Sequence, residues 1–168
     1  NKRFPFPELS GIRHGHLSAQ QIRPVLGDDA YEGYFKFAFV RNPFDRYVSY
    51  CAFISRGSGE FASAPREFMK YVLTELRPLQ HVLYRPQHEF LTAADGRLDI
   101  DYVGRNESMQ ASYDAICAKL GLPTTELGRV NSTTPRPAYT AYYTPELVDL
   151  VQRQYHDDLR LFDYGFGP

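Results

Sequence analysis

Phe35-Lys36-Phe37-Ala38-Phe39-Val40-Arg41-Asn42-Pro43-Phe44-Asp45-Arg46-Tyr47-Val48-Ser49 is the stretch of this sequence that decides the fold. Residues 35–40 are mostly apolar, which predicts a strand buried on both faces, as in a parallel sheet covered by helices. Asn42 is a favourable N-cap residue, and Pro43 suits the first position of a helix. The stretch therefore predicts a buried strand that is followed at once by a helix, and with it an α/β fold.

Arg41 stands at the junction of this strand and this helix. Open α/β sheets bind ligands at the carboxyl ends of their strands, and a planar guanidinium group suits a phosphate. Ser49 is roughly 10 Å further along the helix, at about 1.5 Å per residue, so an arginine that folds back along the helix can share one phosphate with it. Alternatively, Arg41 pairs with a carboxylate and Ser49 only packs. Spacing alone leaves both interpretations open.

The run Val-Arg-Asn-Pro-Phe-Asp-Arg-Tyr-Val-Ser-Tyr at residues 40–50 resembles a known motif. It is similar to the 3′-phosphate-binding motif of the sulfotransferases that use 3′-phosphoadenylyl sulfate, closest to the Golgi carbohydrate sulfotransferases, including heparan sulfate 2-O-sulfotransferase, and their bacterial relatives. The resemblance implies that Arg41 and Ser49 hold the 3′-phosphate of the donor. It implies a three-layer α/β fold, with a parallel sheet flanked by helices as in the P-loop NTPases. The implied reaction transfers a sulfuryl group to a hydroxyl, expected to be that of a carbohydrate, and leaves adenosine 3′,5′-bisphosphate.

His14-Gly15-His16 precedes the strand. A histidine pair by itself is more often structural than catalytic. Two histidines at this spacing can also ligate a metal, but no cysteine or carboxylate stands at a recognisable ligand spacing, so we expect no metal. Sulfuryl transfer needs a base for the proton of the acceptor hydroxyl, which suits an imidazole. Residues 13–18 resemble a His-Gly-His segment of the 2-O-sulfotransferases, which implies that His16 is the general base and His14 a second catalytic or substrate-orienting residue.

The polar stretch at residues 131–139 is a loop by composition. It falls where the sulfotransferases close a segment over the nucleotide. The resemblance therefore implies that Ser132, Thr133 and Arg136 contact the 3′-phosphate or the adenine. Tyr139 either stacks on the adenine or packs against the protein.

Further elements follow from periodicity and capping residues. Asp99 to Glu107 predicts a second buried strand, and Arg105 and Glu107 at its end are expected to pair with each other. Helical spacing and cap residues predict helices over Ala64 to Arg77, over Met109 to Leu120 with Gly121 as the stop, and from Pro145 after Thr144 as N-cap.

Length and composition narrow the class of protein. At 168 residues the chain is expected to be a single domain, and a net charge of −1 provides no general field for nucleic acid or a membrane surface. No apolar run is long enough to span a membrane. Cys51 and Cys117 are expected to be buried thiols rather than a disulfide. The expected location is the cytoplasm for a bacterial protein, or the Golgi lumen for a fragment of a eukaryotic enzyme.

One part of the family pattern has no counterpart in these residues. Sulfotransferases bind the 5′-phosphosulfate with a lysine-bearing loop between a strand and a helix, and no Gly-x-x-x-x-Gly-Lys pattern occurs here. We expect residues 1–168 to be a sulfotransferase-like domain that lacks this loop, as part of a longer enzyme. The alternatives are a non-catalytic nucleotide- or glycan-binding module derived from the fold, or an unrelated phosphate-handling protein.

Overall fold

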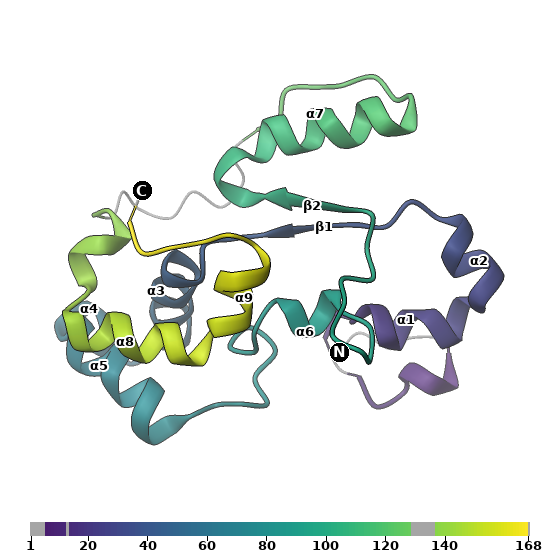
Figure 1. Cartoon of the computed structure of the whole chain (residues 1–168). Coiled ribbons are helices and arrows are strands. Elements are labelled where there is room, and N and C mark those ends of the chain that lie inside the picture. The colour runs from purple at the N-terminus through teal and green to yellow at the C-terminus, as the bar shows by residue number, and fades with distance from the viewer. Residues whose placement is uncertain (1–5, 13, 129–136, 168) are drawn as a thin grey trace.

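The computed structural model describes residues 6–12, 14–128 and 137–167. Short helices dominate this part of the chain, and two strands lie among them (Figure 1). In chain order the elements are η1 (Pro7–Leu9), α1 (Ala19–Leu26), α2 (Asp28–Gly33), β1 (Phe37–Val40), α3 (Pro43–Ile54), α4 (Glu60–Ser63), α5 (Pro65–Tyr71), η2 (Val72–Leu76), α6 (His88–Leu91), β2 (Tyr102–Arg105), η3 (Asn106–Ser108), α7 (Met109–Leu120), η4 (Tyr139–Tyr142), α8 (Pro145–Gln154) and α9 (His156–Leu161).

The strands β1 and β2 form a parallel pair, in which Phe37 lies opposite Tyr102 and Val40 lies opposite Arg105. Helix α7 covers one side of this pair, and α3, α6 and α9 lie on the other side (Figure 1). Because the strands are parallel, their carboxyl ends meet at one edge, where α3 begins after β1 and η3 begins after β2. The structure thus has a small parallel sheet among helices, consistent with the expected α/β fold. The three-layer arrangement of the P-loop NTPases stays a prediction.

The prediction that the first strand is buried on both faces is wrong. The side chains of Phe37 and Phe39 are 45% and 37% exposed, and only Val40 is fully buried. A strand is buried on both faces when neighbours flank both of its edges and helices cover both of its faces. In the described part of the chain β1 pairs with β2 alone, so its other edge has no strand beside it. The strand also begins at Phe37, two residues later than expected.

Helix α3 follows the prediction closely at its start. The Asn42 side chain accepts a hydrogen bond from the Phe44 backbone N–H at 3.0 Å, and Pro43 occupies the first turn. Its apolar face, Phe44, Tyr47, Val48 and Cys51, is buried. The helix ends at Ile54. Its buried face and its capped start together fix where Arg41 emerges from the sheet.

Helix α3 packs into a core that also receives α5, η2 and α8. Buried tyrosines give this core an unusual number of hydroxyl groups, and several donate to backbone carbonyls: Tyr47 to Met69 at 2.6 Å, Tyr143 to Phe44 at 2.8 Å and Tyr155 to Tyr84 at 2.9 Å. Burial with such partners is the usual condition for a tyrosine in a core. The beginning of α3 is therefore anchored to rigid surroundings.

Two other predicted elements differ from the structure, and the rest hold. The predicted second buried strand over residues 99–107 is shorter, Tyr102–Arg105, and only Gly104 in it is buried. Helix α7 spans Met109–Leu120 and ends at Gly121, whose φ of 66° is the left-handed conformation that favours glycine. Thr144 caps α8 as predicted. The predicted helix over residues 64–77 is instead α5 followed by the π-helical turn η2, and Arg77 after it has a φ of 41°.

Cys51 and Cys117 are both buried free thiols, as predicted. Burial raises the pKa of the Cys51 thiol to about 12, which makes it an unreactive part of the core. None of the helices in the described ranges has the length and apolar character needed to cross a membrane.

Candidate functional site

The β1–α3 junction, residues 40–43, presents Arg41 at the carboxyl end of β1. The Arg41 Nε donates to the Asp45 carboxylate at 2.7 Å, so its guanidinium group lies back along the first turn of α3. Asp45 and Ser49 are one helical turn apart and share a face of α3. The contact with a carboxylate is one of the two interpretations left open by the sequence. It also places the guanidinium group beside Asp45, one helical turn before Ser49.

Two side chains from distant segments hold the backbone of the junction. The Gln87 amide accepts a hydrogen bond from the Arg41 N–H at 2.9 Å and donates one to the Arg41 carbonyl at 2.9 Å. The Glu107 carboxylate accepts the Asn42 N–H at 2.6 Å. Polar backbone groups just beyond a strand need such partners because the sheet no longer provides them. Neither contact was predicted from the sequence.

Arg105 and Glu107 do not pair with each other, contrary to expectation. Glu107 instead accepts a hydrogen bond from the Tyr164 hydroxyl at 2.7 Å, in addition to its contact at the junction. The Arg105 guanidinium donates to the Phe162 carbonyl at 2.7 Å and lies 4.5 Å from the centre of the Tyr164 ring. The C-terminal segment, residues 162–167, therefore supplies contacts to both Arg105 and Glu107.

Behind Gln87 lies a fully buried carboxylate, that of Asp158 in α9. It accepts the Gln87 N–H at 2.7 Å, the His88 N–H at 2.8 Å, and a further contact from the His88 ring Nδ1 at 2.8 Å. The hydrogen bond to Asp158 raises the pKa of His88 above its ordinary value, although partial burial opposes the shift. The carboxylate thus fixes the first residues of α6 and, through Gln87, the junction.

His14 and His16 lie in a turn before α1, at the edge of the site. The His16 N–H donates to the His14 ring Nδ1 at 3.3 Å, so His14 helps to fix the backbone of its partner. Ser18, just beyond, caps α1 in a reciprocal arrangement with Gln21. His16 is exposed, and its position is therefore set by the turn and the capped helix rather than by packing of its own ring.

His16 borders a cavity of about 220 Å³ that is also lined by Gln87, the residue that holds the junction. Gln87 and Arg46 are its polar lining residues besides His16, and apolar side chains complete the wall: Phe39, Val82, Leu83, Phe90 and Leu91. Arg46 donates to the Arg85 carbonyl at 3.0 Å. Desolvation lowers the pKa of Arg46, but an arginine remains charged at neutral pH. The cavity therefore combines an imidazole with a cation.

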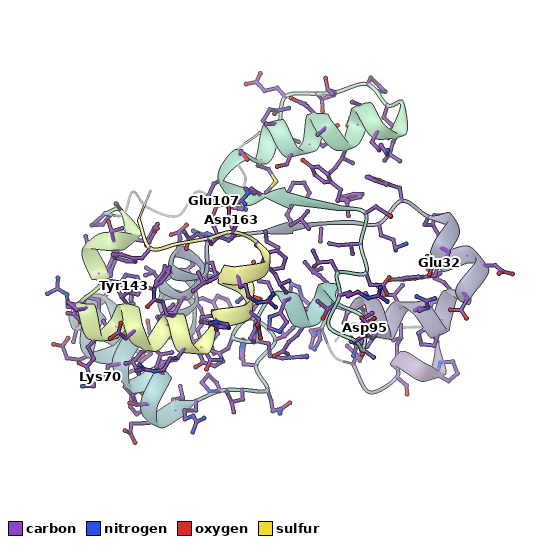
Figure 2. All side chains as sticks on the ribbon, in the orientation of Figure 1. Glu32, Lys70, Asp95, Glu107, Tyr143 and Asp163 are labelled. Carbon is purple, nitrogen blue, oxygen red and sulfur yellow. The ribbon has the colours of Figure 1, made fainter. Side chains whose placement is uncertain are left out.

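A second cavity, of about 350 Å³, lies on the other side of the junction between the carboxyl ends of the two strands. Asn42, Asp45 and Glu107 line it, together with the C-terminal segment. Figure 2 shows Glu107 and Asp163 near each other at this place. Tyr139 also lines the cavity and donates to the Gly167 carbonyl at 2.6 Å, while its ring meets Phe166 edge-on. Of its two expected roles, packing is the one that the contacts of Tyr139 display.

Three predicted site residues, Ser132, Thr133 and Arg136, lie outside the described residues. Within the described ranges, no group of three or more histidine, cysteine or acidic residues is arranged to hold a metal ion. What the described site offers chemically is a guanidinium group at a strand end, a hydroxyl on the same helix face, and an imidazole at a nearby cavity. This combination suits the binding of an anion and a proton transfer beside it.

Comparisons with known proteins agree with this chemistry. Residues 12–165 match the model of the sulfotransferase family. An uncharacterized protein from Archaeoglobus fulgidus is 27% identical over 116 residues, which are 69% of this chain and 92% of the relative. No solved structure matches the chain significantly.

Proposed function

The chain belongs to the sulfotransferase family, and we propose that it moves a sulfuryl group from 3′-phosphoadenylyl sulfate to a hydroxyl group of a carbohydrate. The observation that carries the proposal is the position of Arg41, whose guanidinium group lies at the carboxyl end of β1 and contacts Asp45, one helical turn before Ser49 on α3. Members of the family generally use this donor. Its 3′-phosphate is a dianion that matches the charge and fork geometry of an arginine.

In this proposal Arg41 and Ser49 bind the 3′-phosphate. Asp45 contacts the Nε and Nη2 groups of Arg41. In the proposal the Nη1 group binds a phosphate oxygen while Asp45 holds the guanidinium group in place. Ser132, Thr133 and Arg136 supply further contacts to the nucleotide.

The chemical step needs a base near the acceptor, and we assign that role to His16. The acceptor oxygen attacks the sulfur atom as the bond from sulfur to the 5′-phosphate oxygen breaks, and His16 takes the hydroxyl proton. Adenosine 3′,5′-bisphosphate then leaves with the bonding electron pair. The cavity that His16 shares with Arg46 is the place for the acceptor hydroxyl, because the cation there offsets negative charge that develops during transfer. His14 orients His16 through its backbone contact.

Titration calorimetry with adenosine 3′,5′-bisphosphate and a sulfuryl-transfer assay test the two assignments separately. Arg41→Ala removes charged hydrogen bonds and should weaken nucleotide binding by about 100-fold. His16→Ala should lower turnover by about 10² to 10⁴-fold and leave nucleotide affinity within about twofold. Equal affinity of Arg41→Ala and wild type would refute the nucleotide site, and full turnover of His16→Ala would refute the base. Nucleotide binding without turnover, in a wild-type protein that includes the lysine-bearing loop, would identify a binding module instead.

A further inference from the structure

Gln87 holds Arg41 by both of its backbone polar groups. Its Oε1 accepts the Arg41 N–H and its Nε2 donates to the Arg41 carbonyl, each at 2.9 Å. A primary amide that pairs with both groups of one residue restricts the rotation of the two peptide planes on either side of it. Arg41 follows Val40, the last residue of β1, so the sheet no longer supplies hydrogen-bond partners for its backbone. The two hydrogen bonds to Gln87 take the place of those partners.

The backbone of Gln87 is itself held by Asp158. The Gln87 N–H donates to the buried Asp158 carboxylate at 2.7 Å, and the neighbouring His88 N–H donates to the same carboxylate at 2.8 Å. Asp158 is 0% exposed. A buried carboxylate that loses its donors pays a large desolvation penalty, so this contact resists displacement. The position of Gln87 is therefore set by α9 and not only by its own loop.

This arrangement has a consequence for the side chain of Arg41. The guanidinium group already contacts Asp45 on α3, so its direction depends on both the helix and the orientation of the Arg41 peptide planes. Two parallel hydrogen bonds to a phosphate tolerate little error in that direction, and a displacement of about 1 Å at such a site is costly. We propose that Gln87, anchored by Asp158, is a positioning residue for the 3′-phosphate site, which it serves by fixing the backbone of Arg41. The inference rests on the proposed role of Arg41.

Paired affinities for two nucleotides test it on the 168-residue chain. Adenosine 3′,5′-bisphosphate and adenosine 5′-phosphate differ only in the 3′-phosphate. The dissociation constant of the 5′-phosphate divided by that of the 3′,5′-bisphosphate therefore reports the contribution of that group alone. Gln87→Met keeps the length of the side chain and removes both hydrogen bonds, and it should lower the ratio by about tenfold. In an Arg41→Ala background the same change should alter the ratio by less than about twofold, since the group that Gln87 positions is then gone.

Gln110 provides a matched control, because its amide makes the same kind of contacts with Thr125 and Leu127 instead of with the junction. Its Oε1 accepts the Leu127 N–H at 2.7 Å, and its Nε2 donates to the Thr125 carbonyl at 3.1 Å. Gln110→Met should leave the ratio unchanged. If Gln87→Met does not fold, Gln87→Glu takes its place, since it keeps the acceptor for the Arg41 N–H but replaces the donor with an oxygen, and it should lower the ratio in the same direction.

Three results would overturn the inference. One is an unchanged ratio in both Gln87 variants. Another is an equal loss of affinity for both nucleotides, which would indicate a general structural role. The third is an effect of Gln87→Met that persists in full without the Arg41 side chain. A wild-type chain with no preference for the 3′-phosphate would instead contradict the proposed function, and the inference with it, and this outcome is visible before any Gln87 variant is made.

Discussion

Single residues around the junction act mainly through hydrogen bonds between a side chain and the backbone. Gln87 and Glu107 satisfy backbone groups of Arg41 and Asn42, and Asp158 satisfies those of Gln87 and His88. Unsatisfied buried polar groups are costly, so such contacts specify one local conformation rather than merely adding stability. Among these residues, His88 also makes the stability of the fold depend on pH.

The His88–Asp158 pair should make stability depend on pH in a defined direction. The pKa of His88 is raised in the folded state, chiefly by its hydrogen bond to Asp158. A raised pKa means that the charged pair stabilises the fold fully below the unfolded pKa of about 6.5, and that this contribution is lost as pH rises through the folded value. His88→Asn keeps a donor near the Nδ1 position but does not titrate. The advantage of the wild type over His88→Asn in free energy of unfolding should be larger at about pH 5.5 than at about pH 8.5. The two advantages should differ by on the order of 1 kcal/mol.

Urea unfolding at both pH values measures this difference. His156→Asn serves as the surface control, because the His156 side chain is 73% exposed. A wild-type advantage that grows as pH rises would show that the sign is wrong, and that the neutral form of His88 is the one the fold favours.

At the scale of elements, the strands and their covering helix meet closely at Gly104 in β2. A Cβ atom placed there would lie 2.9 Å from the Phe39 ring of β1 and 3.0 Å from the Ser112 Cβ of α7. Ser112 also accepts the Arg105 N–H through its hydroxyl at 2.9 Å, which ties α7 to the end of β2. The missing side chain of Gly104 is thus what lets the β1 ring and α7 approach β2 together.

Gly104→Ala should therefore destabilise the protein by about 1–3 kcal/mol, since the added methyl overpacks the interface. Gly57→Ala is the control: a Cβ there would meet nothing within 4 Å, and the change should stay within about 0.5 kcal/mol of wild type. Thermal or urea unfolding compares the two. Equal stabilities would mean that Phe39, itself partly exposed, moves aside without cost.

The elements also show which features a sequence can predict. The cap and first turn of α3, the bounds of α7 and the start of α8 were predicted correctly, because they depend on residues a few positions apart. Gln87 and Glu107 reach the junction across 46 and 65 residues, and no periodicity encodes such contacts. The exposure of β1 was missed for a related reason, since burial of a strand depends on which neighbours the sheet contains. The roles of Arg41, Ser49 and His16 stay predictions until they are measured.

At the scale of the whole molecule, α9 links the C-terminal part of the chain to the sheet. Asp158 lies in α9, its backbone partners begin α6, and Gln87 continues the connection to the end of β1. The core formed by α3, α5 and α8 is thus joined to the junction by a polar connection as well as by packing. Loss of Asp158 should consequently affect the stability of the whole domain and not only of one helix end.

Asp158→Asn tests this connection. The asparagine amide places a donor where one carboxylate oxygen accepts, so at least one buried N–H loses its partner and the buried charge near Arg46 is removed. We expect a loss of about 3 kcal/mol in the free energy of unfolding. Asp157→Asn changes the neighbouring residue of α9, whose side chain is 50% exposed, and should cost less than about 0.5 kcal/mol.

Because Asp158 joins separate elements, urea unfolding of Asp158→Asn should remain a single transition at a lower midpoint. A loss confined to α6 and α9, seen as early hydrogen exchange there with an unchanged midpoint, would show that the connection is local and that packing alone unites the molecule.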